Sequence, residues 1–193
     1  TPFKDRISLT QQGNLDADDT DHIANLLTLV QVNKKVKKLY RKARGTREWE
    51  EVNVSAMFKV ATTFYDFLLD AVPPLAGCLN ENKPNIGTLR TKHRHLVARP
   101  VGLVLLAQLY VLFALRDSLP ELKTKLSLLD MDLSGRHFNN VLWSGGKMEP
   151  RNRAVALSLC LYLFGVDGVD VEEVRRDYRR VVKDNQAELP PQL

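Results

Sequence analysis

The side chains with the best prospects for catalysis or metal binding are few and lie apart in the sequence. They are His22, His93, His95 and His137, the cysteines Cys78 and Cys160, and the pair Asp130 and Asp132. His93 and His95 are at positions i and i+2 of a predicted helix, so their side chains point about 200° apart and cannot share a metal ion. The motifs G-x-S-x-G, G-x-x-x-x-G-K-[ST] and H-E-x-x-H are absent. We therefore expect no catalytic residue, no metal site and no cofactor in this part of the protein.

The cysteines and the aspartates have simple structural interpretations. The cysteines form no C-x-x-C motif, which excludes a disulfide scaffold and a cysteine-rich zinc module. We expect two buried, reduced thiols in a cytoplasmic protein. Two aspartates at this spacing are more typical of caps than of an acid–base pair.

What remains is positive charge, in three clusters. Residues 34–47 hold eight Lys or Arg and no acid, although the whole chain has a net charge of only +5. Clustered cations bind nucleic-acid phosphates by releasing condensed counterions, which requires no base contact. The predicted contacts are Lys34, Lys37, Lys38, Arg41, Lys42 and Arg44, then Arg90 and Arg94, and then Arg176, Arg179, Arg180 and Lys183. Acidic neighbours dilute the last cluster, so a solvated helix face is the alternative there.

The first cluster belongs to a helix predicted from about residue 18 to residue 43, after possible N-caps in the acidic stretch 14–21. Its apolar stripe changes face midway, from an early set to a nearly opposite later set. The early set is Ile23, Leu26, Leu27 and Val30, and the later one is Leu29, Val32, Val36, Leu39 and Tyr40. On the face that carries the early set, lysines replace the apolar residues in the later turns of the helix. This pattern predicts a helix that presents charge on one side while its other side packs elsewhere.

Helical periodicity with almost no strand signal predicts an all-α fold, with about seven helices in a bundle or irregular array. Its centre is the apolar run 101–115, which is shorter than the roughly 20 residues that a bilayer requires. Other helices are expected from a cap at Asn53 or Ser55 to Val72, from a cap at Thr88 through Arg99, from the Ser118–Glu121 capping box to Leu129, from Pro150 to Phe164, and from Asp170 onwards. Pro73-Pro74 ends the first of these.

We expect one helical domain, residues 18–185. Residues 1–17 are predicted to be an extended lead-in from a missing upstream part, because the chain begins with neither methionine nor a signal-peptide pattern. Residues 186–193 are predicted to form a flexible tail.

Several short segments resemble a known family. They are Val54-Ser-Ala-Met57-Phe58, Leu89-Arg90 with His93-Arg-His95, Asp132, Asn139-Asn140, Trp143, Gly146-Lys-Met148 and a helix ending in Leu-Phe-Gly165. Over residues 30 to 165 they are similar to the C-terminal helical region of the DGQHR-domain proteins, which include DndB-type regulators of DNA sulfur modification (phosphorothioation). The Asp-Gly-Gln-His-Arg motif itself is absent, and in the family it lies upstream.

The resemblance implies a bacterial cytoplasmic protein of DNA modification or restriction, which acts as a DNA-binding transcription regulator or an accessory subunit. Any nucleotide chemistry would belong to the upstream domain. The implied partners are DNA and, beside it, the missing N-terminal domain or other DNA-modification proteins, with no membrane.

Two functions from different classes follow. The first is a non-catalytic DNA-binding module that contacts the phosphate backbone through its basic clusters. The alternative is a protein-interaction domain that docks an acidic partner or the missing N-terminal domain. Convergence of the three clusters on one face would favour DNA, and their dispersal would favour protein interaction.

Overall fold

The structure is a computed structural model that describes residues 6–9, 19–44, 54–79 and 86–193. These residues form eight α-helices, two single-turn 3-10 helices and two pairs of two-residue strands, which confirms the all-α prediction. The α-helices are α1 (Leu26–Arg44), α2 (Val54–Ala71), α3 (Pro73–Leu79), α4 (Ile86–Thr91), α5 (Pro100–Ala114), α6 (Leu119–Leu128), α7 (Arg153–Leu163) and α8 (Val171–Val182). The 3-10 helices are η1 (Leu96–Ala98) and η2 (Pro150–Asn152), and the strands are β1 (Ile7–Ser8), β2 (Ala24–Asn25), β3 (Trp143–Ser144) and β4 (Lys147–Met148).

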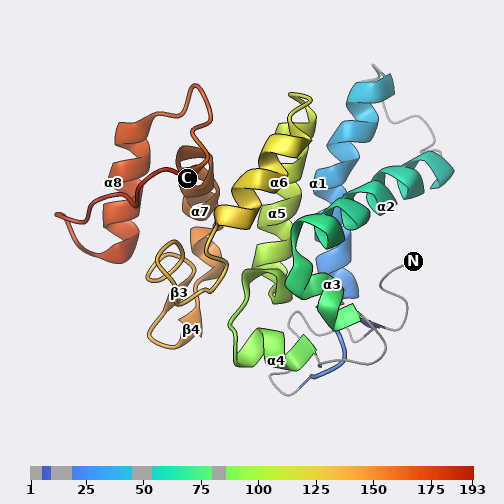
Figure 1. Cartoon of the computed structure of the whole chain (residues 1–193), viewed down its shortest axis with the longest axis horizontal. Helices are drawn as coiled ribbons and strands as arrows, with labels where there is room; N and C mark the ends of the chain where they lie inside the picture. Colours follow the sequence, from blue (N-terminus) through green and yellow to red (C-terminus); the bar gives the residue numbers. More distant parts are fainter. Residues whose placement is uncertain (1–5, 10–18, 45–53, 80–85) are drawn as a thin grey trace.

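Helix α5 lies at the centre of the molecule, as predicted for the apolar run. It begins at Pro100, whose missing N–H group suits the first turn of a helix. Its side chains from Val101 to Val111 are buried except for that of Gln108. It contacts α1, α6, α7 and η1, and in Figure 1 it lies between α1 at one end of the long axis and α8 at the other. Among the described residues, no helix is long and apolar enough to cross a bilayer.

The first turn of α5 packs on η1 with almost no space between them. A Cβ atom on Gly102 would lie 1.9 Å from the carbonyl oxygen of Leu96. Only a hydrogen atom fits there, so this glycine allows η1 and α5 to make their close contact.

Helix α1 begins at Leu26, so its predicted start at residue 18 is wrong. The Asp19 carboxylate accepts hydrogen bonds from the backbone N–H groups of Asp21 and His22, which holds a turn there. Strand β2 then pairs in parallel with β1. The Asn25 side chain accepts bonds from the Thr28 N–H and hydroxyl at 2.8 and 2.7 Å. This capping interaction starts the helix, not the acidic run upstream.

Two other helix starts also differ from the prediction. Thr88 lies inside α4, and the chain leaves the helix after Thr91 and turns, with Arg94 at a φ of 45°. The Ser118 hydroxyl donates to the Phe113 carbonyl and does not cap α6. Asp170, by contrast, caps α8 as predicted, because its carboxylate accepts the N–H groups of Glu172 and Glu173.

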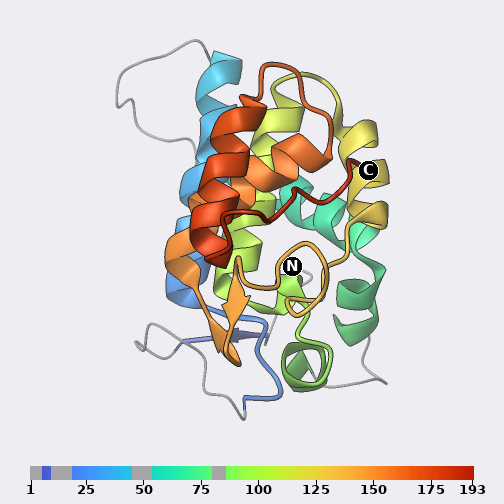
Figure 2. The same ribbon diagram turned by 90° about the vertical axis from the view of Figure 1, so that its left-hand side faces the viewer.

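The C-terminal segment, which the sequence suggests to be a flexible tail, lies against the body of the fold. The Leu193 N–H donates to the Leu163 carbonyl at 2.8 Å, and the Gln192 side chain donates to the Tyr162 carbonyl at 3.0 Å. Lys125 of α6 donates to the Leu193 carbonyl. Figure 2 shows this segment running back across the helices from α8.

Candidate functional site

The first basic cluster lies on a helix with two different faces. Thr28, Val32 and Val36 are buried where α1 contacts α5 and α2. The early apolar set is mostly exposed instead, at 50% for Leu26, 49% for Leu27 and 41% for Val30. We call Leu26, Leu27, Val30, Lys34 and Lys38 the outer face of α1.

The lysines of this outer face are available to a partner. The side chains of Lys34 and Lys38 are exposed and form no ion pair within the part of the chain that the structure describes. Lys37 is half-buried and has a contact of its own. The predicted contacts Arg41, Lys42 and Arg44 have side chains outside the described set. The described part of the outer face is thus an apolar patch that continues into free positive charge.

The third cluster, on α8, is largely neutralised by its own helix. Arg176 pairs with Glu173 at 3.9 Å, and Arg180 pairs with Asp177 at 3.0 Å. Arg179 donates to the Ala187 carbonyl at 2.9 Å and lies 3.3 Å from the Glu188 carboxylate. These are the i, i+3 and tail contacts that stabilise an exposed helix surface. Lys183, the fourth predicted contact, ends α8 in the left-handed conformation.

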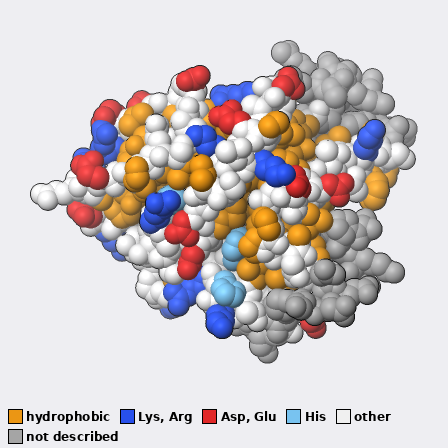
Figure 3. Space-filling view, viewed as in Figure 1, with side chains coloured by type: hydrophobic (Ala, Val, Ile, Leu, Met, Phe, Trp, Pro, Cys, Tyr) orange, Lys and Arg blue, Asp and Glu red, His pale blue; other side chains and the backbone are white. Residues whose placement is uncertain are grey.

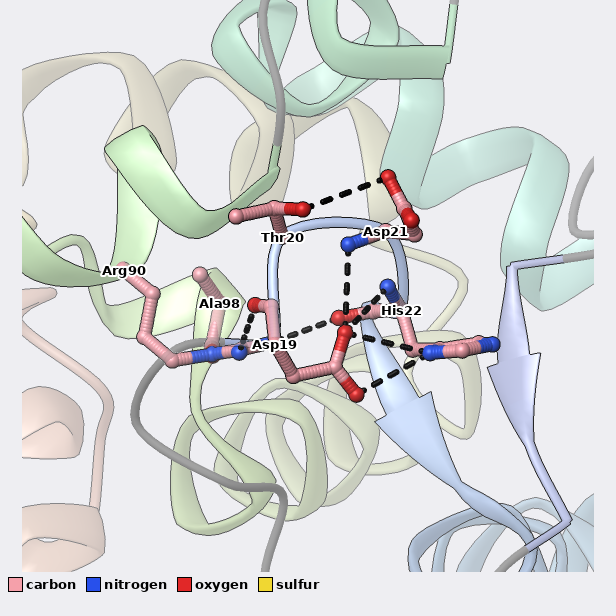
Figure 4. Close-up of polar contacts among 6 residues, drawn as sticks. All are labelled: Asp19, Thr20, Asp21, His22, Arg90 and Ala98. Carbon is pink, nitrogen blue, oxygen red and sulfur yellow. Dashed lines mark hydrogen bonds and ion pairs between the residues drawn. The ribbon is translucent and has the colours of Figure 1, made fainter.

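The second cluster contains a buried structural arginine. Arg90 is only 3% exposed. Its guanidinium group donates to the carbonyls of Ala98 at 3.2 Å and Asp19 at 2.7 Å, and also to the His22 carbonyl (Figure 4). Burial lowers the pKa of Arg90, and the nearby Asp19 charge opposes that shift. Arg90 therefore joins the N-terminal segment to η1, and its prediction as a phosphate contact is wrong because the core encloses it.

Two other arginines gather on one tryptophan. The guanidinium carbons of Arg94 and Arg99 lie 5.9 and 5.8 Å from the ring centroid of Trp143 in β3, within the range of a cation–π interaction. Backbone pairing aligns the segments: the Leu96 N–H donates to the Met131 carbonyl at 2.8 Å, and the Leu133 N–H to the Arg94 carbonyl at 3.0 Å. We call Arg94, Arg99 and Trp143 the arginine–tryptophan cluster.

Sequence reasoning predicted Arg94 but missed Arg99 and Trp143 as members of a site. Arg99 lies at the end of the segment predicted to be helical from Thr88, and Trp143 lies in the segments that carry the family resemblance. Their proximity depends on the fold of the loop 130–142, which no local pattern indicates.

Two of the histidines, His95 and His137, act as internal hydrogen-bond acceptors, whereas the Nδ1 atom of His22 pairs with the Asp19 carboxylate at 3.0 Å. The His95 Nδ1 atom accepts the Val97 N–H at 3.2 Å, and the His137 Nδ1 atom accepts the Asp130 N–H at 3.0 Å. Burial, with a smaller contribution from His93, lowers the pKa of His95 to about 4 against the pull of Asp132 and Asp130. Burial and then Arg136 lower the pKa of His137. No three His, Cys, Asp or Glu side chains gather as a possible metal site among the residues described.

The three basic clusters lie in three parts of the molecule. Figure 1 places α1, α4 and α8 towards one end, the lower edge and the other end of the fold. On the face that Figure 3 shows, the coloured Lys and Arg side chains are interspersed with Asp and Glu. Cys78 and Cys160 are buried and free, as predicted.

Comparisons of the chain with protein families, curated proteins and solved structures find no match.

Proposed function

We propose that this helical domain docks an acidic protein segment through the outer face of α1. The observation that carries the proposal is the continuity of that face, from exposed Leu26, Leu27 and Val30 to Lys34 and Lys38, which form no ion pair with a described residue. An exposed apolar patch next to charge is typical of an interaction surface. Phosphate contacts require the cations but gain little from exposed leucines, so the combination favours a protein partner.

The shape of this face suggests which kind of segment fits it. Leu26 and Lys38 are separated by about 18 Å along the helix at 1.5 Å per residue. An amphipathic partner helix of about three turns covers that length, as in recognition of a helix through its apolar face. Leucine-type side chains would contact Leu26, Leu27 and Val30, and Glu or Asp at the other end would pair with Lys34 and Lys38. The acidic residues set the orientation of the partner, because charge complementarity fixes register.

Dispersal of the other cations also favours this proposal over DNA binding. A DNA duplex could not contact Arg90, because this side chain is buried. Arg176 and Arg180 of α8 are already paired with carboxylates. DNA binding by a modification regulator, which the family resemblance implies, stays the competing prediction and is tested by the same experiment.

The test compares two labelled ligands by fluorescence anisotropy: a three-turn helical peptide with leucines at one end and glutamates at the other, and a 20-base-pair duplex. We expect peptide binding that weakens at least tenfold in Leu27→Gln/Val30→Gln and, separately, in Lys34→Gln/Lys38→Gln. The matched control is Leu128→Gln/Lys92→Gln, which removes an exposed leucine and an exposed lysine outside α1 and leaves binding unchanged.

Two results would overturn the proposal. One is no saturable peptide binding by the unaltered chain. The other is duplex binding that exceeds peptide binding, falls with salt, and responds to the lysine pair but not to the apolar pair. The second result would establish the DNA prediction in its place.

A further inference from the structure

We propose that the arginine–tryptophan cluster binds the phosphoryl group of a small phosphorylated ligand. It is a different surface from the outer face of α1, so neither proposal depends on the other. The cluster joins the turn before η1, the start of α5 and the β3–β4 hairpin, three elements that are brought together only by the fold.

The cluster holds two positive charges, of which Asp132 offsets only a part among the described residues. Within the described ranges, neither Arg94 nor Arg99 forms an ion pair, although Asp132 lies near enough for its pKa to be lowered by Arg94. Arg99 donates through Nη2 to the backbone carbonyl of Arg90. Burial and then the charge of Arg90 lower the pKa of Arg99. Like charges this close repel each other, and a bound anion removes the repulsion.

The start of α5 adds to this positive potential. Arg99 is the N-cap residue of that helix, and its side chain caps no backbone N–H. The N-terminal end of a helix carries partial positive charge, which adds to the positive potential at Arg99, although the first turn itself packs on η1.

The donors of the two arginines are only partly used. The Arg99 Nε atom is buried without a hydrogen-bond partner among the described residues and is closed to a ligand. Nη2 makes the one bond that we observe for this side chain, which leaves the Nη1 donors for a ligand. The Arg94 guanidinium contacts the Trp143 ring, and we observe no hydrogen bond from it to described residues. Stacking on an aromatic ring fixes the guanidinium plane and leaves N–H groups at its edge free.

Charge and geometry together select the ligand class. Arginine forks match phosphate oxygens in bidentate geometry. A phosphoryl group carries roughly −1.5 to −2 charge at neutral pH. It therefore balances two guanidinium groups, whereas one carboxylate balances only one.

Trp143 makes the site directly measurable. The chain has two tryptophans, so Trp49→Phe leaves Trp143 as the single reporter. In that background we titrate inorganic phosphate and pyrophosphate at constant ionic strength, with potassium chloride as the balancing salt, and record tryptophan fluorescence. We expect a saturable change with a dissociation constant of about 1 mM or below, tighter for pyrophosphate.

Variants separate a built site from general charge attraction. Arg94→Gln and Arg99→Gln should each weaken pyrophosphate binding at least tenfold. Arg116→Gln, an exposed arginine beyond the opposite end of α5, is the matched control and should leave binding unchanged. Because Arg99 also contacts the Arg90 carbonyl, circular dichroism checks its fold, and the exposed Arg94 gives the result that does not depend on packing.

Three results would overturn the proposal. One is a fluorescence change that never saturates or that chloride reproduces at equal ionic strength. Another is unchanged binding in Arg94→Gln. The last is saturation by a 12-base-pair duplex but not by phosphate or pyrophosphate, which would assign the cluster to nucleic-acid phosphodiesters.

Discussion

The segment 90–99 and helix α8 are both rich in arginine, yet the molecule uses their arginines in opposite ways. Arg90 is buried and bonded to backbone carbonyls, whereas Arg176 and Arg180 are exposed and paired with carboxylates one turn away. The difference is visible in the acidic neighbours: α8 supplies Glu173 and Asp177 at i, i+3 spacing, and segment 90–99 has no acid. Arg90, which has no local acid, finds its acceptors in backbone carbonyls of the fold, so charge density alone does not identify a binding surface.

The largest expected effect comes from removing the buried arginine. Arg90→Met should lower the free energy of unfolding by about 3 kcal/mol or more, because the carbonyls of Asp19, His22 and Ala98 lose their donor in a buried place. Arg90→Lys should retain only a part of the stability that Arg90→Met loses, since an ammonium group lacks the planar fork of guanidinium. Urea denaturation measures both, and a loss below about 1 kcal/mol for Arg90→Met would contradict this structural role.

The next effect is a pH dependence that originates mainly in His95 of segment 90–99. His95 has a folded-state pKa of about 4, below its unfolded value of about 6.5. The unfolded chain therefore binds the extra proton first, and stability is full above pH 6.5 and falls as the pH drops towards 4, by up to about 3 kcal/mol. The buried His137, whose pKa is also lowered, adds to the loss in the same direction.

His95→Asn is the matched control, because an asparagine oxygen can accept the Val97 N–H without titrating. Thermal unfolding measured from pH 7.5 to 4.5 should give a flatter curve for this variant than for the unaltered chain. Parallel curves would show that the pH dependence originates elsewhere.

On α8 the cap should matter more than the ion pairs. Asp170→Ala should destabilise the protein by about 1 kcal/mol, because the Glu172 and Glu173 N–H groups lose their acceptor. Asp170→Asn should retain most of that stability. Ser118→Ala at the start of α6 provides a contrast, since its hydroxyl caps no N–H group there, and equal losses for the two alanine variants would argue against the cap.

The smallest effect is expected for the paired arginines themselves. Arg176→Gln and Arg180→Gln should each change the free energy of unfolding by at most about 0.5 kcal/mol, because exposed ion pairs are weak. The change should shrink further in 1 M salt. A salt-independent loss of more than 1 kcal/mol of unfolding free energy in either variant would contradict the predicted difference between these arginines and Arg90.

Elements defined by local patterns were predicted well. The apolar run of α5 and the stripe of α2 (Val54–Ala71, predicted to Val72) depend on periodicity within one helix. The Asp170 cap of α8 is likewise a local feature. Such patterns specify a helix before its neighbours are known.

Features that depend on distant segments were missed. The start of α1 is displaced by the pairing of β2 with β1, which lies far upstream, and by the Asn25 cap. The stripe of α1 correctly indicated two faces, but burial against α5 selected Thr28, Val32 and Val36 and left Leu26 and Leu27 outside. The arginine–tryptophan cluster needs the loop 130–142 to return beside Arg94, and no periodicity predicts that.

The close contact between η1 and α5 also limits how the protein can be stabilised by design. Gly77 in α3 and Gly102 in α5 both lie in helices, where alanine is normally worth about 1 kcal/mol more than glycine. A Cβ atom at Gly77 has no neighbour within 4 Å, so Gly77→Ala should increase the stability of the protein. At Gly102 the Leu96 carbonyl occupies that space, and a library built on helix propensity should keep this glycine fixed.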